Sequence, residues 1–184
     1  QPAYQSAIEA SPEAENDLLR LKQALTDRGY YEAITYSFVD PGVQKVLAPD
    51  VEAIALANPL SSEMSVMRST IWAGLLQALK YNVNRQQSRV RLFETGLCFT
   101  PGSAGGSDGA VAGITQVPMF SGVICGDVHD QQWAEKARRV DFFDLKADVE
   151  ALLAFTGTQT VFEAAEHAAL QPGQSACMRQ DGEI

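Results

Sequence analysis

Residues 67–102 read MRSTIWAGLLQALKYNVNRQQSRVRLFETGLCFTPG and hold the clearest helix and strand patterns of the chain. Apolar residues recur every three or four positions over residues 70–85, which predicts a helix. They form two interlocking rows, Ile71-Leu75-Leu79 and Trp72-Leu76-Leu79-Val83. So wide an apolar arc indicates a helix packed on more than one side. Residues 89–99 are rich in aromatic and β-branched side chains and predict a strand.

A second strand is expected at residues 120–125, FSGVIC, because the run is short, apolar and partly β-branched. It is the best candidate to pair with residues 89–99. The intervening segment PGSAGGSDGA, residues 101–110, has low complexity and predicts a hairpin loop. The centre of the chain is therefore expected to be a β-hairpin that follows a helix.

The N-terminal part predicts one helix and two strands after a linker at residues 1–10. Ser11 suits a helix N-cap and Pro12 the first helical position, so a helix is expected over residues 12–28. Residues 30–38 are predicted as a strand that ends at the turn residues 40–42. Residues 51–57 are predicted as another strand.

In the C-terminal part a short helix is expected at residues 130–139 and a longer one at 142–155. Strands are expected at 158–163 and 175–179, separated by a turn at 171–173. Strands and helices do not alternate strictly, so the pattern favours an α+β fold with a mostly antiparallel sheet flanked by helices. Asp181-Gly182 is a hairpin signal without its return strand. We therefore interpret residues 11–184 as one domain, truncated at its C-terminus, from a longer protein.

Composition narrows the classes of function. The 184 residues carry a formal net charge of −9, and no basic stripe of the kind that binds nucleic acid is visible. No apolar run approaches the ~20 residues of a membrane-spanning helix. Three dispersed cysteines and two histidines support neither a disulfide framework nor a zinc site, which suits a reducing cytosol.

No catalytic or metal-binding constellation emerges from the residues alone. The glycine-rich segment lacks the Gly-Lys-Ser/Thr ending of a phosphate-binding loop, and Cys98 has no nearby histidine to act as a base. Asp141, Asp144 and Asp148 follow the spacing of one helix face, which leaves a magnesium site open. Acidic residues that stabilise the start of a helix are the favoured interpretation.

Several short motifs occur in a fixed order along most of the chain. They are YYEAITYSF at 30–38, NPLS at 58–61, EMSVMR at 63–68, NVNRQ at 82–86, FETG at 93–96, VDFFDLK at 140–146 and PGQSA at 172–176. Together they resemble the catalytic-like region of the β subunit of bacterial phenylalanyl-tRNA synthetase, a class II aminoacyl-tRNA synthetase. Gln171 departs from the pattern, which favours histidine there.

The resemblance implies a partner. Residues 12–28 and 31–38 match the first class II motif, an interface element that would pack on the α subunit within an (αβ)₂ assembly. On this basis Leu18, Leu21, Leu25 and Phe38 are expected at the subunit interface. The complex would act in the cytoplasm and use ATP and magnesium to join phenylalanine to its tRNA. This acidic segment would contact the tRNA little.

The same resemblance implies that this segment has lost its own chemistry. The second class II motif continues Phe-Arg-x-Glu, whereas this chain has Phe99-Thr100-Pro101-Gly102. Thr100 cannot supply the charged fork with which arginine grips phosphate, and Gly102 replaces the glutamate that addresses adenine. We therefore expect no catalytic, cofactor-binding or metal-binding residue in the segment. Two alternatives stay open: a stand-alone paralogue with a binding or regulatory role, and an active enzyme with measurable affinity for ATP.

Overall fold

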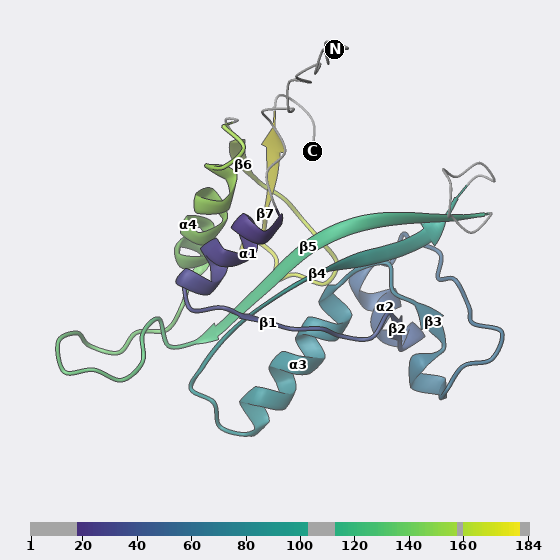
Figure 1. The fold of residues 1–184 in the computed structure, drawn as a ribbon, viewed down its shortest axis with the longest axis horizontal. Helices are drawn as coiled ribbons and strands as arrows, with labels where there is room; N and C mark the ends of the chain where they lie inside the picture. The colour runs from purple at the N-terminus through teal and green to yellow at the C-terminus, as the bar shows by residue number, and fades with distance from the viewer. Residues whose placement is uncertain (1–17, 103–112, 158–159, 181–184) are drawn as a thin grey trace, which may run out of the picture.

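The computed structural model of the chain describes residues 18–102, 113–157 and 160–180 (Figure 1). The predicted linker at residues 1–10 and most of the glycine-rich segment lie outside the described residues. In chain order the elements are α1 (Leu18–Asp27), β1 (Tyr31–Glu32), β2 (Phe38–Val39), α2 (Pro41–Leu47), the 3₁₀ turn η1 (Ser62–Met64), β3 (Val66–Met67), α3 (Trp72–Asn84), β4 (Arg89–Pro101), β5 (Ile114–Gly126), α4 (Phe142–Leu153), β6 (Thr160–Ala164) and β7 (Ala176–Gln180).

The long hairpin of β4 and β5 is the centre of the fold. The two strands pair antiparallel from Arg89 opposite Gly126 to Pro101 opposite Ile114. β1 adds to β4 in parallel, so the sheet order is β1-β4-β5. The predicted hairpin is confirmed, although β5 begins six residues before the predicted 120–125 strand because residues 114–119 also join the ladder with β4. β2 with β3 and β6 with β7 form two small antiparallel sheets.

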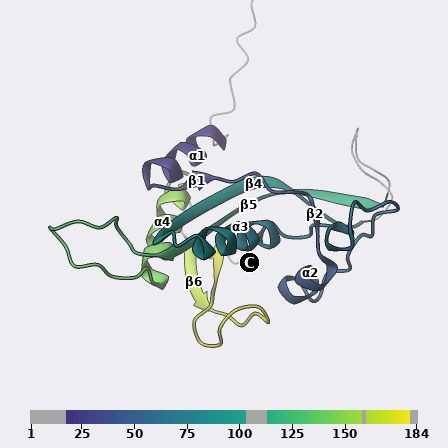
Figure 2. The ribbon, with the colours of Figure 1, turned by 90° about the horizontal axis from the view of Figure 1, so that it is seen from below.

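Helices cover both faces of the hairpin (Figures 1 and 2). Alternate residues of β4 point to opposite faces, so Phe93 packs with Leu25 of α1 and Leu152 of α4. Leu92 packs on the other face, with Ile71 and Leu75 at the start of α3. Ile71 and Leu75 are completely buried, and each such side chain contributes about 1.5–3 kcal/mol on burial. The helix predicted at residues 70–85 is thus confirmed as α3. Ile71 and Leu75 face the sheet, but Leu76 and Val83 of the second predicted row are 41% and 44% exposed, so the expectation that this whole arc is packed is corrected.

Residues 30–38 do not form the single strand that was predicted. They contain β1 and β2, which belong to different sheets. β1 pairs with β4 at Tyr31 and Glu32. Beyond this pairing the backbone N–H of Thr35 donates to the side chain of Glu94 on β4, at 3.2 Å, and not to a backbone carbonyl of that strand, so the regular ladder does not continue to Phe38.

Three further predictions need correction. Asp40 and Pro41 do not only end a strand: the Asp40 side chain accepts from the backbone of Gly42 and Val43 and caps helix α2, which was not predicted. Residues 51–57 form no strand and touch β3 through one bridge, Ala55 to Val66. Residues 130–139 form no helix but a projecting loop, whose neck is closed by the Val128 N–H donating to the Arg138 carbonyl, at 3.0 Å.

The C-terminal predictions agree better with the structure. α4 matches the predicted helix at 142–155, and the strands predicted at 158–163 and 175–179 correspond to β6 and β7, whose antiparallel pairing with each other was not predicted. Residues 158–159 and the Asp181-Gly182 pair lie outside the described part of the chain. Among the described residues no helix is long and apolar enough to cross a membrane.

Candidate functional site

The two residues that stand for the lost second motif lie at the open end of the β4–β5 hairpin. Thr100 pairs with Thr115, and the Gly102 N–H donates to the Gly113 carbonyl at 3.0 Å. A Cβ atom at position 102 would lie 2.0 Å from the Thr115 hydroxyl oxygen and 3.0 Å from its backbone nitrogen. The backbone at Gly102 is therefore packed too closely against β5 to carry a glutamate without a local shift.

The face of β4 that carries Thr100 also holds a buried ion pair. Arg68 Nη1 lies 2.6 Å from Glu94 Oε1, and both side chains are at most 5% exposed. Arg68 Nε donates to the Leu97 carbonyl at 3.0 Å, and the Thr35 hydroxyl donates to Glu94 at 2.7 Å. Gly96 makes room for this guanidinium, because a Cβ there would lie 2.2 Å from Arg68 Nη2.

This ion pair gives the Phe-Glu-Thr-Gly motif a structural explanation that sequence reasoning missed. Glu94 neutralises the arginine, and Gly96 leaves space for it. The guanidinium of Arg68 is committed to Glu94, Leu97 and Thr35, and is not free to bind a phosphate group. Arg68 and Glu94 were visible in the sequence only as members of two separate motifs.

Cys98 lies on the same face of β4 and is 1% exposed. It packs with Ile71 and Leu75 of the core. Burial raises the pKa of its thiol, which disfavours the thiolate needed for nucleophilic attack or metal binding. The structure therefore agrees with the interpretation of Cys98 as an inert core residue.

The three aspartates of the predicted helix have separate partners. Asp141 and Asp144 form a reciprocal capping box at the start of α4, and Arg138 binds Asp144 through two nitrogens at 2.7 Å. Hydrogen bonds from Arg138 lower the pKa of Asp144 to about 2. The helix-start interpretation is confirmed for these two residues. Within the described ranges no three acidic, histidine or cysteine side chains are placed to hold a metal ion.

Asp148, in contrast, is a buried centre that connects α4 to the sheet and to the end of α1. Its Oδ2 accepts from the Tyr30 hydroxyl at 2.7 Å and from Arg91 at 3.1 Å, while its Oδ1 accepts from Arg28 at 2.9 Å. Burial, and then the bond to Asp148, raises the pKa of Tyr30 far above its ordinary value. Sequence spacing could not reveal this cluster, because its partners lie 57 to 120 residues away.

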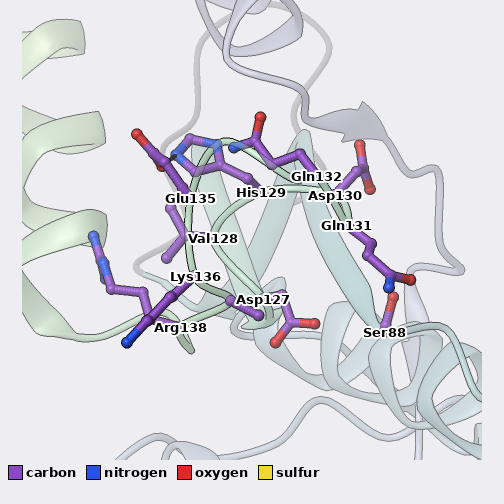
Figure 3. A pocket seen from close by; sticks show the side chains of 11 residues that line it. Ser88, Asp127, Val128, His129, Asp130, Gln131, Gln132, Glu135, Lys136 and Arg138 are labelled. Atoms are coloured by element: carbon purple, nitrogen blue, oxygen red, sulfur yellow. Dashed lines mark ion pairs between the residues drawn. The ribbon is translucent and has the colours of Figure 1, made fainter.

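A hollow of about 660 Å³ lies inside the projecting loop and is lined by Ser88 and by residues 127–132 and 135–138 (Figure 3). His129 and Glu135 approach to 3.6 Å on one side of it, but both side chains are more than 60% exposed. Residues 129–138 are exposed throughout. The hollow thus offers solvated polar groups and not a desolvated site for chemistry.

The four residues expected at a subunit interface differ in how exposed their side chains are. Leu18 is 48% exposed, and Leu21 and Phe38 are half-buried. Leu25 is 3% exposed and packs on Tyr30 and Phe93 of its own chain, so its expected partner-facing role is corrected to a core role. Its position on the inner side of α1 makes it part of the domain's own packing.

Other apolar side chains on the same segment are far more exposed than the sequence suggested. Tyr31 is 74% exposed, Ile34 92% and Tyr36 71%. They lie along β1 and the connection to β2, the edge of the main sheet. The aromatic and β-branched residues of this segment predicted a strand. They did not indicate which of its side chains would face the core and which would face solvent.

Comparison with solved structures supports a synthetase fold. The chain superposes on a pyrrolysyl tRNA synthetase from Desulfitobacterium hafniense with a TM-score of 0.53 and 18% sequence identity, covering 82% of this chain and 50% of that one. A second pyrrolysyl-tRNA synthetase structure from this organism gives a TM-score of 0.54 at 15% identity, over 79% of this chain and 48% of that one. At such identity the likeness concerns the fold alone.

Sequence comparison is more specific. The chain is 48% identical over 183 residues to the phenylalanine–tRNA ligase beta subunit of Pseudomonas fluorescens and 52% identical over 161 residues to that of Coxiella burnetii. These alignments cover 98% and 86% of the chain but only 22% and 19% of the relatives, so it spans about a fifth of their length. The model of the phenylalanyl tRNA synthetase beta chain CLM domain matches residues 1–184. The chain therefore belongs to the phenylalanyl tRNA synthetase beta chain family, in its CLM domain.

Proposed function

We propose that this segment is a non-catalytic, class II synthetase-like scaffold within the β subunit of a phenylalanine–tRNA ligase. The ligase as a whole would use ATP to attach phenylalanine to its tRNA in the cytoplasm. The family match over the chain and the names of its relatives support the parent activity. The geometry at Gly102, packed against Thr115 where the motif calls for glutamate, is the observation that most favours the scaffold role.

The loss of nucleotide binding follows from two features of β4. Thr100 supplies no positive charge for a phosphate, and the nearest buried guanidinium along that face, Arg68, is held by Glu94. An ATP site needs donors that are free to meet the phosphate oxygens. ATP and Mg²⁺ would therefore be bound by the α subunit, and the phenylalanine chemistry would take place there.

The scaffold role also requires contact with the α subunit. The apolar side chains Leu18, Tyr31, Ile34 and Tyr36 are exposed along α1 and β1 and just beyond, on a chain whose net charge is −9. Clusters of exposed apolar residues mark protein interfaces more often than solvated surface. We place the α subunit on this edge, in an (αβ)₂ assembly, and expect the tRNA to be held mainly by other parts of the complex.

Calorimetry tests the nucleotide claim. The β subunit, purified without α, is titrated with ATP and Mg²⁺, and we expect no saturable heat. The α subunit serves as the positive control under the same buffer conditions. Binding of ATP by β in the micromolar range that Thr100→Ala abolishes would overturn the degenerate-site proposal and favour an active nucleotide-binding enzyme.

A further inference from the structure

The corner where α1 ends and β1 begins is held by a buried carboxylate. Arg91 and the Tyr30 hydroxyl both donate to Oδ2 of Asp148, so this side chain is oriented from inside the protein. Its second oxygen, Oδ1, is left to accept from Arg28, the residue directly after α1. Asp148 is 5% exposed, whereas the Arg28 side chain is 40% exposed. The pair thus links a fixed acceptor in α4 to a surface arginine at the end of α1.

Two further contacts restrict the same corner. Gly29 adopts a φ of +79°, and the Tyr30 N–H donates back to the Leu25 carbonyl at 3.0 Å, which ends the helix. The Arg89 guanidinium lies 2.9 Å from the place a Gly29 Cβ would occupy, and Arg89 Nε donates to the Val128 carbonyl at 3.2 Å. The chain direction from α1 into β1 is therefore defined by contacts at this corner.

The rest of α1 is attached more loosely. Leu25 is its one buried residue among Leu18–Asp27. Arg20 lies over the Phe155 ring at 4.6 Å, and Lys22 pairs with Glu32 at the surface. A helix with one fully buried side chain relies more on the contacts at its end for its orientation, and the Arg28–Asp148 pair is such a contact.

We propose that Arg28, through its ion pair with Asp148, is a positioning residue for subunit assembly: it holds α1 and the start of β1 in the orientation that the α subunit recognises. This inference rests on the proposed scaffold function. Loss of the pair leaves Asp148 bonded to Arg91 and Tyr30, so the core of the domain stays formed. What changes is the fraction of molecules in which α1 is correctly placed, and the apparent affinity falls by that fraction.

The test uses the full-length β subunit and measures its dissociation constant for the α subunit. In Arg28→Gln we expect this dissociation constant to rise about five-fold. A rise of this size corresponds to a fall to about one fifth in the fraction of β molecules whose α1 is oriented for binding. Arg28→Lys, which keeps the charge, should restore most of the affinity. Arg179→Gln is the matched control: Arg179 is also 40% exposed and pairs with Glu163 at 2.8 Å, but on β7, and its loss should leave the affinity unchanged.

Two readouts separate positioning from a merely structural role. Hydrogen exchange in Arg28→Gln should accelerate at the amides of α1 but not at those of β4 or α4, and the thermal midpoint should stay close to that of wild type. Wild-type affinity in Arg28→Gln, or a loss of affinity that simply accompanies unfolding, overturns the inference. If wild-type β fails to bind α at all, the proposed scaffold function fails instead, which is a distinguishable result.

Discussion

At the scale of single residues, buried charge in this domain is satisfied by neighbours that are distant in sequence. Arg68 and Glu94 are bonded to each other and to Thr35, and Asp148 is shared by two arginines and a tyrosine. Breaking the Arg68–Glu94 pair, in which both side chains are at most 5% exposed, by removing one partner would cost about 3–5 kcal/mol, because the remaining charge is left uncompensated. A position packed directly against such a cluster therefore has room only for a small residue. Gly96, beside Arg68, is the clearest example.

We predict that Gly96→Ala destabilises the domain by about 1–3 kcal/mol, the range for overpacking a well-packed core. The added methyl group would lie 2.2 Å from Arg68 Nη2, and this guanidinium cannot move aside without losing its bond to Glu94. Urea unfolding followed by circular dichroism measures the change. Gly122→Ala on β5 is the control, since a Cβ there meets its nearest atom at 3.5 Å. Equal stability of the two variants would contradict the proposed role of Gly96.

At the scale of elements, the patterns that were predicted correctly are those that depend on local sequence. α3 and β4 form where the local apolar, aromatic and β-branched pattern predicted a helix and a strand, although their buried residues do not follow a strict period. Residues 30–38 are divided into β1 and β2, and between them Thr35 is bonded to Glu94, a residue 59 positions away that local sequence does not indicate. The local Asp40-Pro41 signal was available, since it resembles the Ser11-Pro12 pair, but it was interpreted as a turn. The sequence could predict the features of the candidate site that follow from which residue stands at a position, as at Thr100 and Gly102. It could not predict features that follow from contacts between distant residues, as at Asp148.

The N-terminus of α4 gives a prediction at this scale. Its capping residue Asp144 has a pKa of about 2 in the folded chain against 3.8 as the reference value. A depressed folded pKa means that the ionised side chain stabilises the fold above the reference pKa, and that this contribution is lost as the pH falls through the folded pKa. We therefore expect wild type to exceed Asp144→Asn in stability at pH 5, with the difference shrinking between pH 4 and pH 2.

Chemical unfolding of both proteins across this pH range measures the effect. Lys146→Gln, which removes the exposed pair with Glu150 on the same helix, controls for a general loss of surface charge. A stability difference that stays constant down to pH 2 would contradict the assignment of the low pKa to Asp144.

At the scale of the whole molecule, helices lie on both faces of the sheet, and β1 is its edge strand, with no further strand paired to it among residues 18–102, 113–157 and 160–180. α3 packs against β4 and β5 on one face, and α1 with α4 covers the other. The edge strand β1 and the connection to β2 combine unpaired strand edge with exposed aromatic and aliphatic side chains. Exposed edges of this kind favour association with another chain. The contrast between the helix-covered faces of the sheet and its exposed β1 edge is the reason for proposing that the α subunit binds at this edge.

Ile34 is the sharpest probe of that placement, because its side chain is 92% exposed and its removal costs the isolated domain little. We predict that Ile34→Asp in the full-length β subunit changes the free energy of unfolding by less than about 0.5 kcal/mol, as surface substitutions usually do. A charge buried at the centre of an apolar interface should nevertheless weaken binding to the α subunit at least about ten-fold, since a few central residues dominate such contacts. Val161→Asp, at a 59% exposed position on β6, should leave the complex intact in size-exclusion chromatography. Full co-elution of the Ile34→Asp subunit with α would show that the β1 edge is not part of the interface. Because the substitution should leave the fold unchanged, a change in fold could not account for that result.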